Sequence, residues 1–168
     1  MKYYISPALI LLVGCVDTSS GVETYAPFRP THSNEVVSAY SFYGWSESTH
    51  RNELKDLVGV DPVQTEWCAA FVNAVLRLNG KEGSESVSEY PLTARSFLAW
   101  GNPVKEPESG DIVVFPRGNE GWQGHVGFYV RTAMFNGEEH YVILGGNQDN
   151  SVSIEYYPAA KAIGIRRP

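Results

Sequence analysis

The stretch 66–79 limits the fold most, because it is apolar around most of a helical circumference. One stripe at helical spacing carries six apolar side chains: Trp67, Ala70, Phe71, Ala74, Val75 and Leu78. The other side is nearly as apolar, with Cys68, Val72 and Leu76. A helix of this kind is buried against neighbours on several sides. The pattern predicts a central helix over 66–79, with Thr65 as its N-terminal cap and Gly80 as its stop.

Shorter patterns surround this helix. Helices are expected over 34–43, 49–58 (closed by Gly59) and 94–100 (capped by Thr93). From Asp111 onward the signal changes to short β runs, expected over 111–115, 125–131, 140–144 and 151–156. Helices first and an antiparallel meander second predict an α+β fold, with the helices packed on one face of a sheet.

Composition narrows the functional classes. The 168 residues carry a formal net charge of -6 and no long run of Lys and Arg, which argues against a nucleic-acid partner. With 43% hydrophobic residues the chain can bury one sizeable core, so we expect one catalytic domain over 34–168. The sequence contains no Cys-x-x-Cys and no His-Glu-x-x-His, so neither a metal nor another cofactor is expected.

The first fifteen residues are typical of an export signal. An apolar stretch over 5–13 is too short to span a bilayer and has the length of a signal-peptide core. It ends in Leu12-Val13-Gly14-Cys15, which resembles a bacterial lipobox. We therefore expect a signal peptide over 1–14, a lipid on Cys15 and a flexible tether over 15–33. An uncleaved anchor or a buried strand is the alternative.

A lipid on Cys15 would attach the domain to a membrane, facing the periplasm. By resemblance to lipoprotein sorting, Val16 in the next position favours the outer membrane. Lipidation would also leave Cys68 without a disulfide partner, since the chain has only these two cysteines.

Cys68 is the candidate nucleophile. In the first turn of the central helix, unpaired backbone N–H groups and the helix dipole favour a thiolate. Glu66, two residues earlier, would instead raise the pKa of the thiol. The backbone N–H of Cys68 is the expected oxyanion donor, with the Gln64 side chain as an alternative. The competing interpretation is that Cys68 is a small buried apolar residue.

His125 is the histidine best placed to act as the base. It begins a strand in Gln123-Gly124-His125-Val126-Gly127, and alternation puts His125 and Tyr129 on one face of the sheet. Gly127 has no side chain, so we expect the end of the central helix to approach beside the imidazole there.

Asn147 is the candidate for the third group, which orients the imidazole. If the strands form a hairpin across 132–139, Arg131 faces His140 and Asn147 lies one position from being opposite His125. A simple turn role for Asn147 is the alternative.

Four blocks in this order resemble the CHAP-type and NlpC-type peptidoglycan hydrolases. They are Trp67-Cys68-Ala69-Ala70-Phe71-Val72-Asn73, Ser109-Gly110-Asp111-Ile112-Val113-Val114-Phe115, Gly124-His125-Val126-Gly127-Phe128-Tyr129 and Gly145-Gly146-Asn147-Gln148. The likeness covers residues 35–168 and implies a papain-like fold with a Cys-His-Asn triad, in which Asn147 fills the third position. Asp111 is expected to fix a turn.

The resemblance also implies an activity. It points to a cell-wall hydrolase, an amidase or endopeptidase that cleaves an amide bond of peptidoglycan through a thioester acyl-enzyme. Trp67, Trp122 and Gln123 are expected to contact the substrate, although ordinary core and rim packing is the alternative for the aromatic residues. Two other functions stay open: a catalytically inactive wall-binding or interaction lipoprotein, and a cysteine peptidase acting on proteins.

Overall fold

The computed structural model describes residues 32–168. The expected signal peptide, Cys15 and nearly all of the expected tether lie outside the described residues. Within the described part, no helix combines the length and apolarity needed to cross a membrane.

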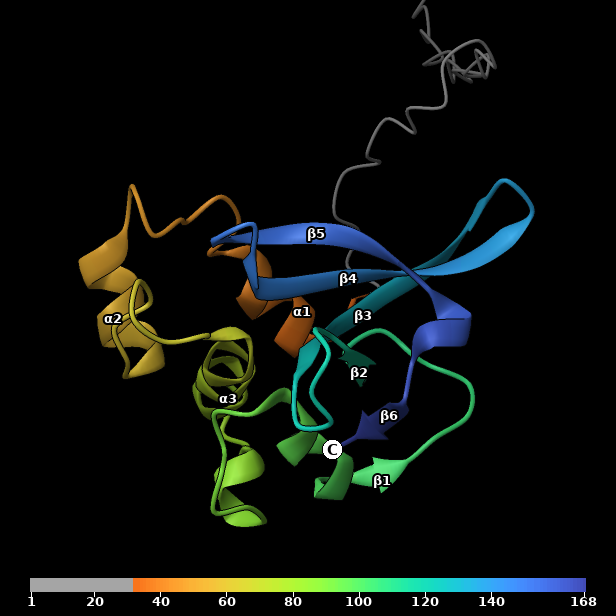
Figure 1. The fold of residues 1–168 in the computed structure, drawn as a ribbon, viewed down its shortest axis with the longest axis horizontal. Helices are drawn as coiled ribbons and strands as arrows, with labels where there is room; N and C mark the ends of the chain where they lie inside the picture. The colour runs from red at the N-terminus through yellow and green to blue at the C-terminus, as the bar shows by residue number, and fades with distance from the viewer. Residues whose placement is uncertain (1–31) are drawn as a thin grey trace, which may run out of the picture.

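Helices come first in the described chain (Figure 1). They are α1 (Asn34–Tyr40), α2 (Arg51–Val58) and α3 (Cys68–Leu78), followed by the 3-10 helices η1 (Ser84–Ser86) and η2 (Ala94–Ala99). Gly59 ends α2 in the left-handed conformation, with φ 78°, as the sequence predicts.

An antiparallel sheet follows. Its strands are β1 (Asn102–Pro103), β2 (Ile112–Pro116), β3 (Gly124–Phe135), β4 (Glu138–Gln148), β5 (Ser151–Pro158) and β6 (Gly164–Arg167), with η3 (Ala159–Lys161) before the last. Their order is β1-β6-β2-β3-β4-β5, and all neighbours pair antiparallel. The predicted α+β class is confirmed. Strands β1 and β6 were not predicted, because they are too short to show a periodic pattern.

The central helix α3 ends as the sequence predicts. The N–H of Lys81 donates to the carbonyl of Leu76, and the N–H of Gly80 donates to that of Arg77. This is the Schellman arrangement that a glycine stop allows.

The start of α3 differs from the prediction. Thr65 is not the cap: Trp67 occupies the cap position, and no side chain caps the helix there. Trp67 is fully buried and its indole N–H donates to Glu47 at 2.9 Å, which holds this residue outside the helix. Cys68 is therefore the first residue of α3.

The two faces of the sheet carry separate cores. Val126, Phe128 and Val130 of β3 pack with the helices, as alternation predicts. Tyr129 belongs to a smaller cluster on the other face. The helices thus cover one face of the sheet (Figure 1).

The β3–β4 hairpin turns at Asn136-Gly137, both with positive φ (48° and 80°), as a two-residue hairpin turn requires. The predicted connection across 132–139 was wrong, because this Asn-Gly signal keeps the strands paired to their tips. Arg131 faces Val142 rather than His140, and the register shifts between Tyr129 and Arg131.

The start of α3 packs against β4 at Gly146, and not against β3 at Gly127 as the sequence predicts. A Cβ on Gly146 would lie 2.5 Å from Cζ3 of Trp67 and 2.7 Å from Cβ of Phe71. A Cβ on Gly127 would meet Ile143 and the carbonyl of Leu144, so that glycine serves the contact between β3 and β4.

Asp111 fixes a turn before β2, as predicted. Its carboxylate accepts from the N–H of Glu108 at 2.7 Å and from Arg167 at 2.8 Å and 2.9 Å. The turn and the last strand are thereby joined.

Gly146→Ala should lower the free energy of unfolding by about 1–3 kcal/mol, because the new methyl group overpacks the contact with Trp67. Urea unfolding followed by fluorescence measures this change. The matched control is Gly121→Ala, where a Cβ meets nothing within 4 Å and no positive φ is required. Equal stability of the two variants would contradict the packing assigned to Gly146.

Candidate active site

Cys68 occupies the N-terminal turn of α3 and is 3% exposed. Its backbone N–H and those of the next residues have no acceptor inside the helix. The described chain contains no disulfide at this residue, and its thiol is free. The predicted nucleophile therefore lies at a helix start, in a buried place.

The backbone of β3 reaches Cys68 beyond the point where β3 and β4 stop pairing. The pairing of these strands stops at Phe128 and Leu144, and β4 continues through two glycines toward Gln148. At this place the backbone N–H of Val126 lies close enough to Cys68 to lower the pKa of its thiol. Because Val126 follows His125, Cys68 lies near the strand segment that carries this histidine.

His125 is buried and held by Gln148. Its Nε2 lies 3.0 Å from Oε1 of Gln148, and its ring stacks on Tyr157 with centroids 5.3 Å apart. The Gln148 amide is in turn fixed, since its Nε2 donates to the carbonyl of Ser153 at 2.8 Å. The Tyr157 hydroxyl donates to Gln148 Oε1 at 3.2 Å.

This network decides which imidazole nitrogen carries the proton. A carbonyl can only accept, so the Gln148 nitrogen must face Ser153 and its oxygen must face His125. His125 Nε2 is then the donor, and Nδ1 keeps its lone pair. Nδ1 has no hydrogen-bond partner among residues 32–168. It is the atom free to take a proton.

Burial keeps both reactive groups neutral at rest. It raises the pKa of the Cys68 thiol, and the nearby charge of Glu66 acts in the same direction. The Arg117 guanidinium and the N–H groups of Val126 and Ala69 oppose this shift. Burial also lowers the pKa of His125 to about 3, and Arg117 contributes to the lowering.

Asn147 faces away from this network. Its Nδ2 donates to Glu66 Oε2 at 2.6 Å, and its backbone takes the left-handed conformation with φ 56°. Arg117 Nη1 lies 3.8 Å from the same Glu66 oxygen. The hydrogen bond predicted for Asn147 is thus made by the next residue, Gln148, and Asn147 instead joins the end of β4 to the segment before α3.

The other predicted site residues lie in different surroundings. Trp67 is fully buried in the core, so its ring offers no surface to a substrate. Trp122 is 65% exposed. The Gln123 side chain accepts from the N–H groups of Asn119 and Glu120 and so shapes its own loop. Within 32–168 no three His, Cys, Asp or Glu side chains are grouped as a metal site requires.

Comparison with known families found one match. The model of the CHAP domain matches residues 60–147, just over half of the chain. The chain belongs to the CHAP domain family. Searches of curated proteins and of solved structures found no match.

Sequence reasoning missed two residues of this CHAP domain site. Gln148 lies in the quoted Gly-Gly-Asn-Gln block, but the assumed hairpin register pointed one residue short of it. Arg117 follows β2 in an exposed loop, and nothing in its sequence neighbourhood marks it. Its side chain nevertheless supplies the cation that acts on Cys68, His125 and Tyr157.

The pKa of His125 predicts how stability depends on pH. In the unfolded chain this imidazole binds a proton near pH 6.5, whereas in the folded CHAP domain it does so only near pH 3. Between these pH values the unfolded state therefore binds more protons than the folded state. The free energy of unfolding falls as the pH drops through this window, because only the unfolded chain can protonate His125 readily. Urea midpoints at pH 7 and pH 4 should differ more for the wild type than for His125→Gln, and an equal difference would contradict the assignment.

Proposed function

We propose that this protein is a peptidoglycan hydrolase, an amidase or endopeptidase in which Cys68 is the nucleophile and His125 the base. Family membership supports hydrolysis of the cell wall. One observation carries the choice of residues: His125 presents an unpartnered buried Nδ1 while Gln148 holds its Nε2–H, beside the amide that lies close to Cys68. Gln148, in place of the expected Asn147, is the orienting group.

The reaction begins from a neutral pair. As Cys68 Sγ attacks the amide carbonyl carbon, its proton passes to His125 Nδ1. The imidazolium then gives this proton to the leaving amine, and the C–N bond breaks to form a thioester on Cys68. Water, deprotonated by the same nitrogen, attacks the thioester and releases the acid and the thiol.

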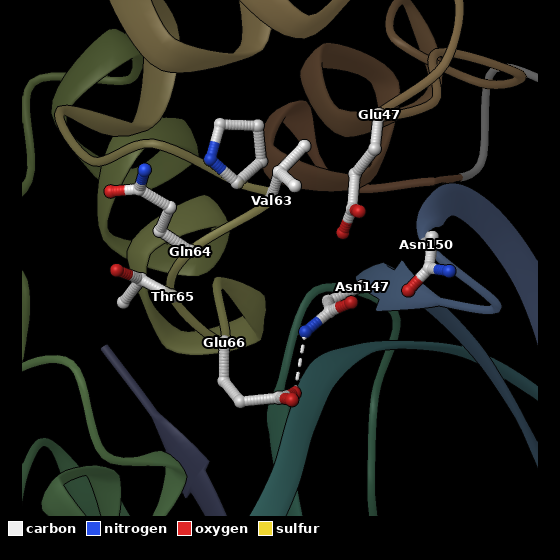
Figure 2. A pocket seen from close by; sticks show the side chains of 8 residues that line it. Glu47, Val63, Gln64, Thr65, Glu66, Asn147 and Asn150 are labelled. Atoms are coloured by element: carbon white, nitrogen blue, oxygen red, sulfur yellow. Dashed lines mark hydrogen bonds between the residues drawn. The ribbon is translucent and has the colours of Figure 1, made fainter.

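Two features stabilise the charges that develop. The N–H of Cys68 has no acceptor at the start of α3 and is the proposed donor to the oxyanion. Gln148 Oε1 accepts from Nε2–H and stabilises the imidazolium, as it does for the ground-state tautomer. Gln64, the alternative donor, is exposed, and Figure 2 shows its amide directed away from Asn147.

Access to the thiol requires a local opening. Cys68 is almost fully buried, and the contacts of Glu66 with Asn147 and Arg117 lie next to it. Glu66 is largely exposed, so its contacts are weak and can yield to a substrate. In free enzymes, catalytic contacts are often incomplete and tighten only in the complex.

Purified peptidoglycan incubated with the full-length chain in mild detergent should release new amino groups, with fragment masses that identify the bond. Cys68→Ala should reduce release to background, because no other described side chain replaces the thiol. Gln148→Leu should lower kcat by about 10–100-fold through loss of imidazole orientation. Asn147→Gly, which keeps the positive φ, should have the smaller effect on kcat.

The pH dependence of the same assay distinguishes a role of Gln148 in orienting His125 from a general effect of the substitution on folding. In Gln148→Glu a carboxylate beside Nε2 favours the imidazolium, so the acid limb of kcat/KM should move to higher pH. An unmoved limb would remove Gln148 from the mechanism. A folded wild type that releases nothing would instead support the inactive wall-binding lipoprotein, and cleavage of a protein alone would support the cysteine peptidase.

We also propose that the chain is lipidated at Cys15 and held at the outer membrane. The apolar stretch that ends in Gly14-Cys15 supports this, and Val16 supports the choice of membrane. Mass spectrometry of the N-terminal peptide should show residues 1–14 removed and acyl chains on Cys15. An unmodified Met1 peptide would refute the anchor.

A further inference from the structure

We infer that Tyr157 is a positioning residue of this site, whose hydroxyl holds the Gln148 amide and whose ring holds the His125 imidazole. The inference rests on the proposed function and deepens it, since it adds a third side chain to the group that orients the base. Tyr157 belongs to β5, whereas the base belongs to β3 and the amide to the end of β4.

The ring of Tyr157 stacks on two neighbouring side chains of the sheet. Its centroid lies 5.3 Å from that of His125, with 18° between the ring planes, and 4.6 Å from that of Phe115, with 23° between the planes. Phe115 and His125 face each other in the pairing of β2 with β3. Rotation of the imidazole about its Cβ–Cγ bond would therefore require the Tyr157 ring to move.

Gln148 uses every hydrogen-bonding position of its side-chain amide. Its Nε2 donates to the carbonyl oxygen and to Oγ of Ser153, at 2.8 Å and 3.1 Å. Its Oε1 accepts from Nε2 of His125 at 3.0 Å and from the hydroxyl of Tyr157 at 3.2 Å. A side-chain amide has two donors and two acceptor lone pairs, so this set is complete. Loss of the hydroxyl would leave one lone pair of a buried oxygen unused and hold the amide less firmly.

Gly145 leaves room for this network in β4. A Cβ at this position would lie 3.2 Å from Oε1 of Gln148 and 3.3 Å from Nε2 of His125. In the order of the sheet β4 lies between β3 and β5. Because the middle strand has no side chain beside this hydrogen bond, groups from all three strands can meet there.

The hydroxyl of Tyr157 keeps its proton. Burial raises the pKa of Tyr157 to about 12, and the charge of Glu155 acts in the same direction, whereas Arg117 opposes the shift. A protonated hydroxyl can donate to Oε1 of Gln148 throughout the neutral range. Tyr157 therefore adds no titration of its own to the site at neutral pH.

The stacked ring favours the imidazolium that forms during the proposed reaction. A cation within about 6 Å of an aromatic centroid is attracted to the electron-rich face of the ring. The attraction grows as the proton of Cys68 arrives on His125, and an interaction that strengthens in this way raises kcat. It opposes burial and the charge of Arg117, which both lower the pKa of His125.

A double-mutant cycle on the full-length chain in mild detergent tests the inference, with solubilised peptidoglycan as the substrate and rates taken per folded protein. Tyr157→Phe removes only the hydroxyl and should lower kcat about 2–10-fold without changing KM. In the Gln148→Leu background the same substitution should lower kcat no further, because the hydroxyl then has no amide to hold. Tyr157→Leu also removes the ring and should lower kcat about 3–30-fold more than Tyr157→Phe, in both backgrounds.

Tyr141 provides the matched control. It faces Tyr157 in the pairing of β4 with β5, belongs to the same small cluster, and packs its ring on Tyr129. Tyr141→Phe and Tyr141→Leu should therefore leave the kcat of the folded protein unchanged in both backgrounds. Urea midpoints of all variants record any loss of stability separately from the rates.

Each other outcome has a defined meaning. Wild-type kcat in Tyr157→Phe, or equal losses in both backgrounds, would overturn the inference and leave the proposed function intact as long as Cys68→Ala is inactive. A change confined to KM would also overturn it, and would assign Tyr157 to substrate contact in the hollow of about 200 Å³ that it lines with Arg117 and Gln148. A folded wild type that releases no amines would overturn the proposed function, and the inference with it.

Discussion

The close contact between the start of α3 and Gly146 is the constraint on which the site depends. Only a glycine leaves room for the rings of Trp67 and Phe71 at this place in β4. Because Trp67 is locked into the core and tied to Glu47, it fixes the residue that follows it, Cys68.

Packing also explains the protonation states of Cys68 and His125. A thiolate–imidazolium pair forms only where the surroundings lower the pKa of the thiol below that of the imidazole. Here burial disfavours both charged forms, and Arg117 disfavours the imidazolium further. In the mechanism proposed above, proton transfer from Cys68 to His125 therefore accompanies bond formation, and the Gln148 oxygen stabilises the imidazolium as it forms.

The central parts of the fold could be predicted because they repeat a period or end at a glycine. The burial of α3, its stop at Gly80 and the alternation in β3 all follow from such patterns. The residue that contacts the His125 imidazole could not be predicted in this way, because the alternation of the strands does not reveal a one-residue register shift in the hairpin. The shift and the left-handed turn at Asn147 direct Gln148, rather than its neighbour, toward the imidazole. Arg117 lies in a loop and influences Cys68 and His125 through its charge, so no sequence spacing indicates its role.

The burial of Cys68 has a chemical consequence beyond catalysis. Peroxides and disulfides react with exposed thiolates far faster than with buried, protonated thiols. At 3% exposure and with a raised pKa, the resting thiol offers such reagents neither access nor negative charge. The fold thus protects this sulfur from oxidants for as long as the surroundings of Cys68 stay closed.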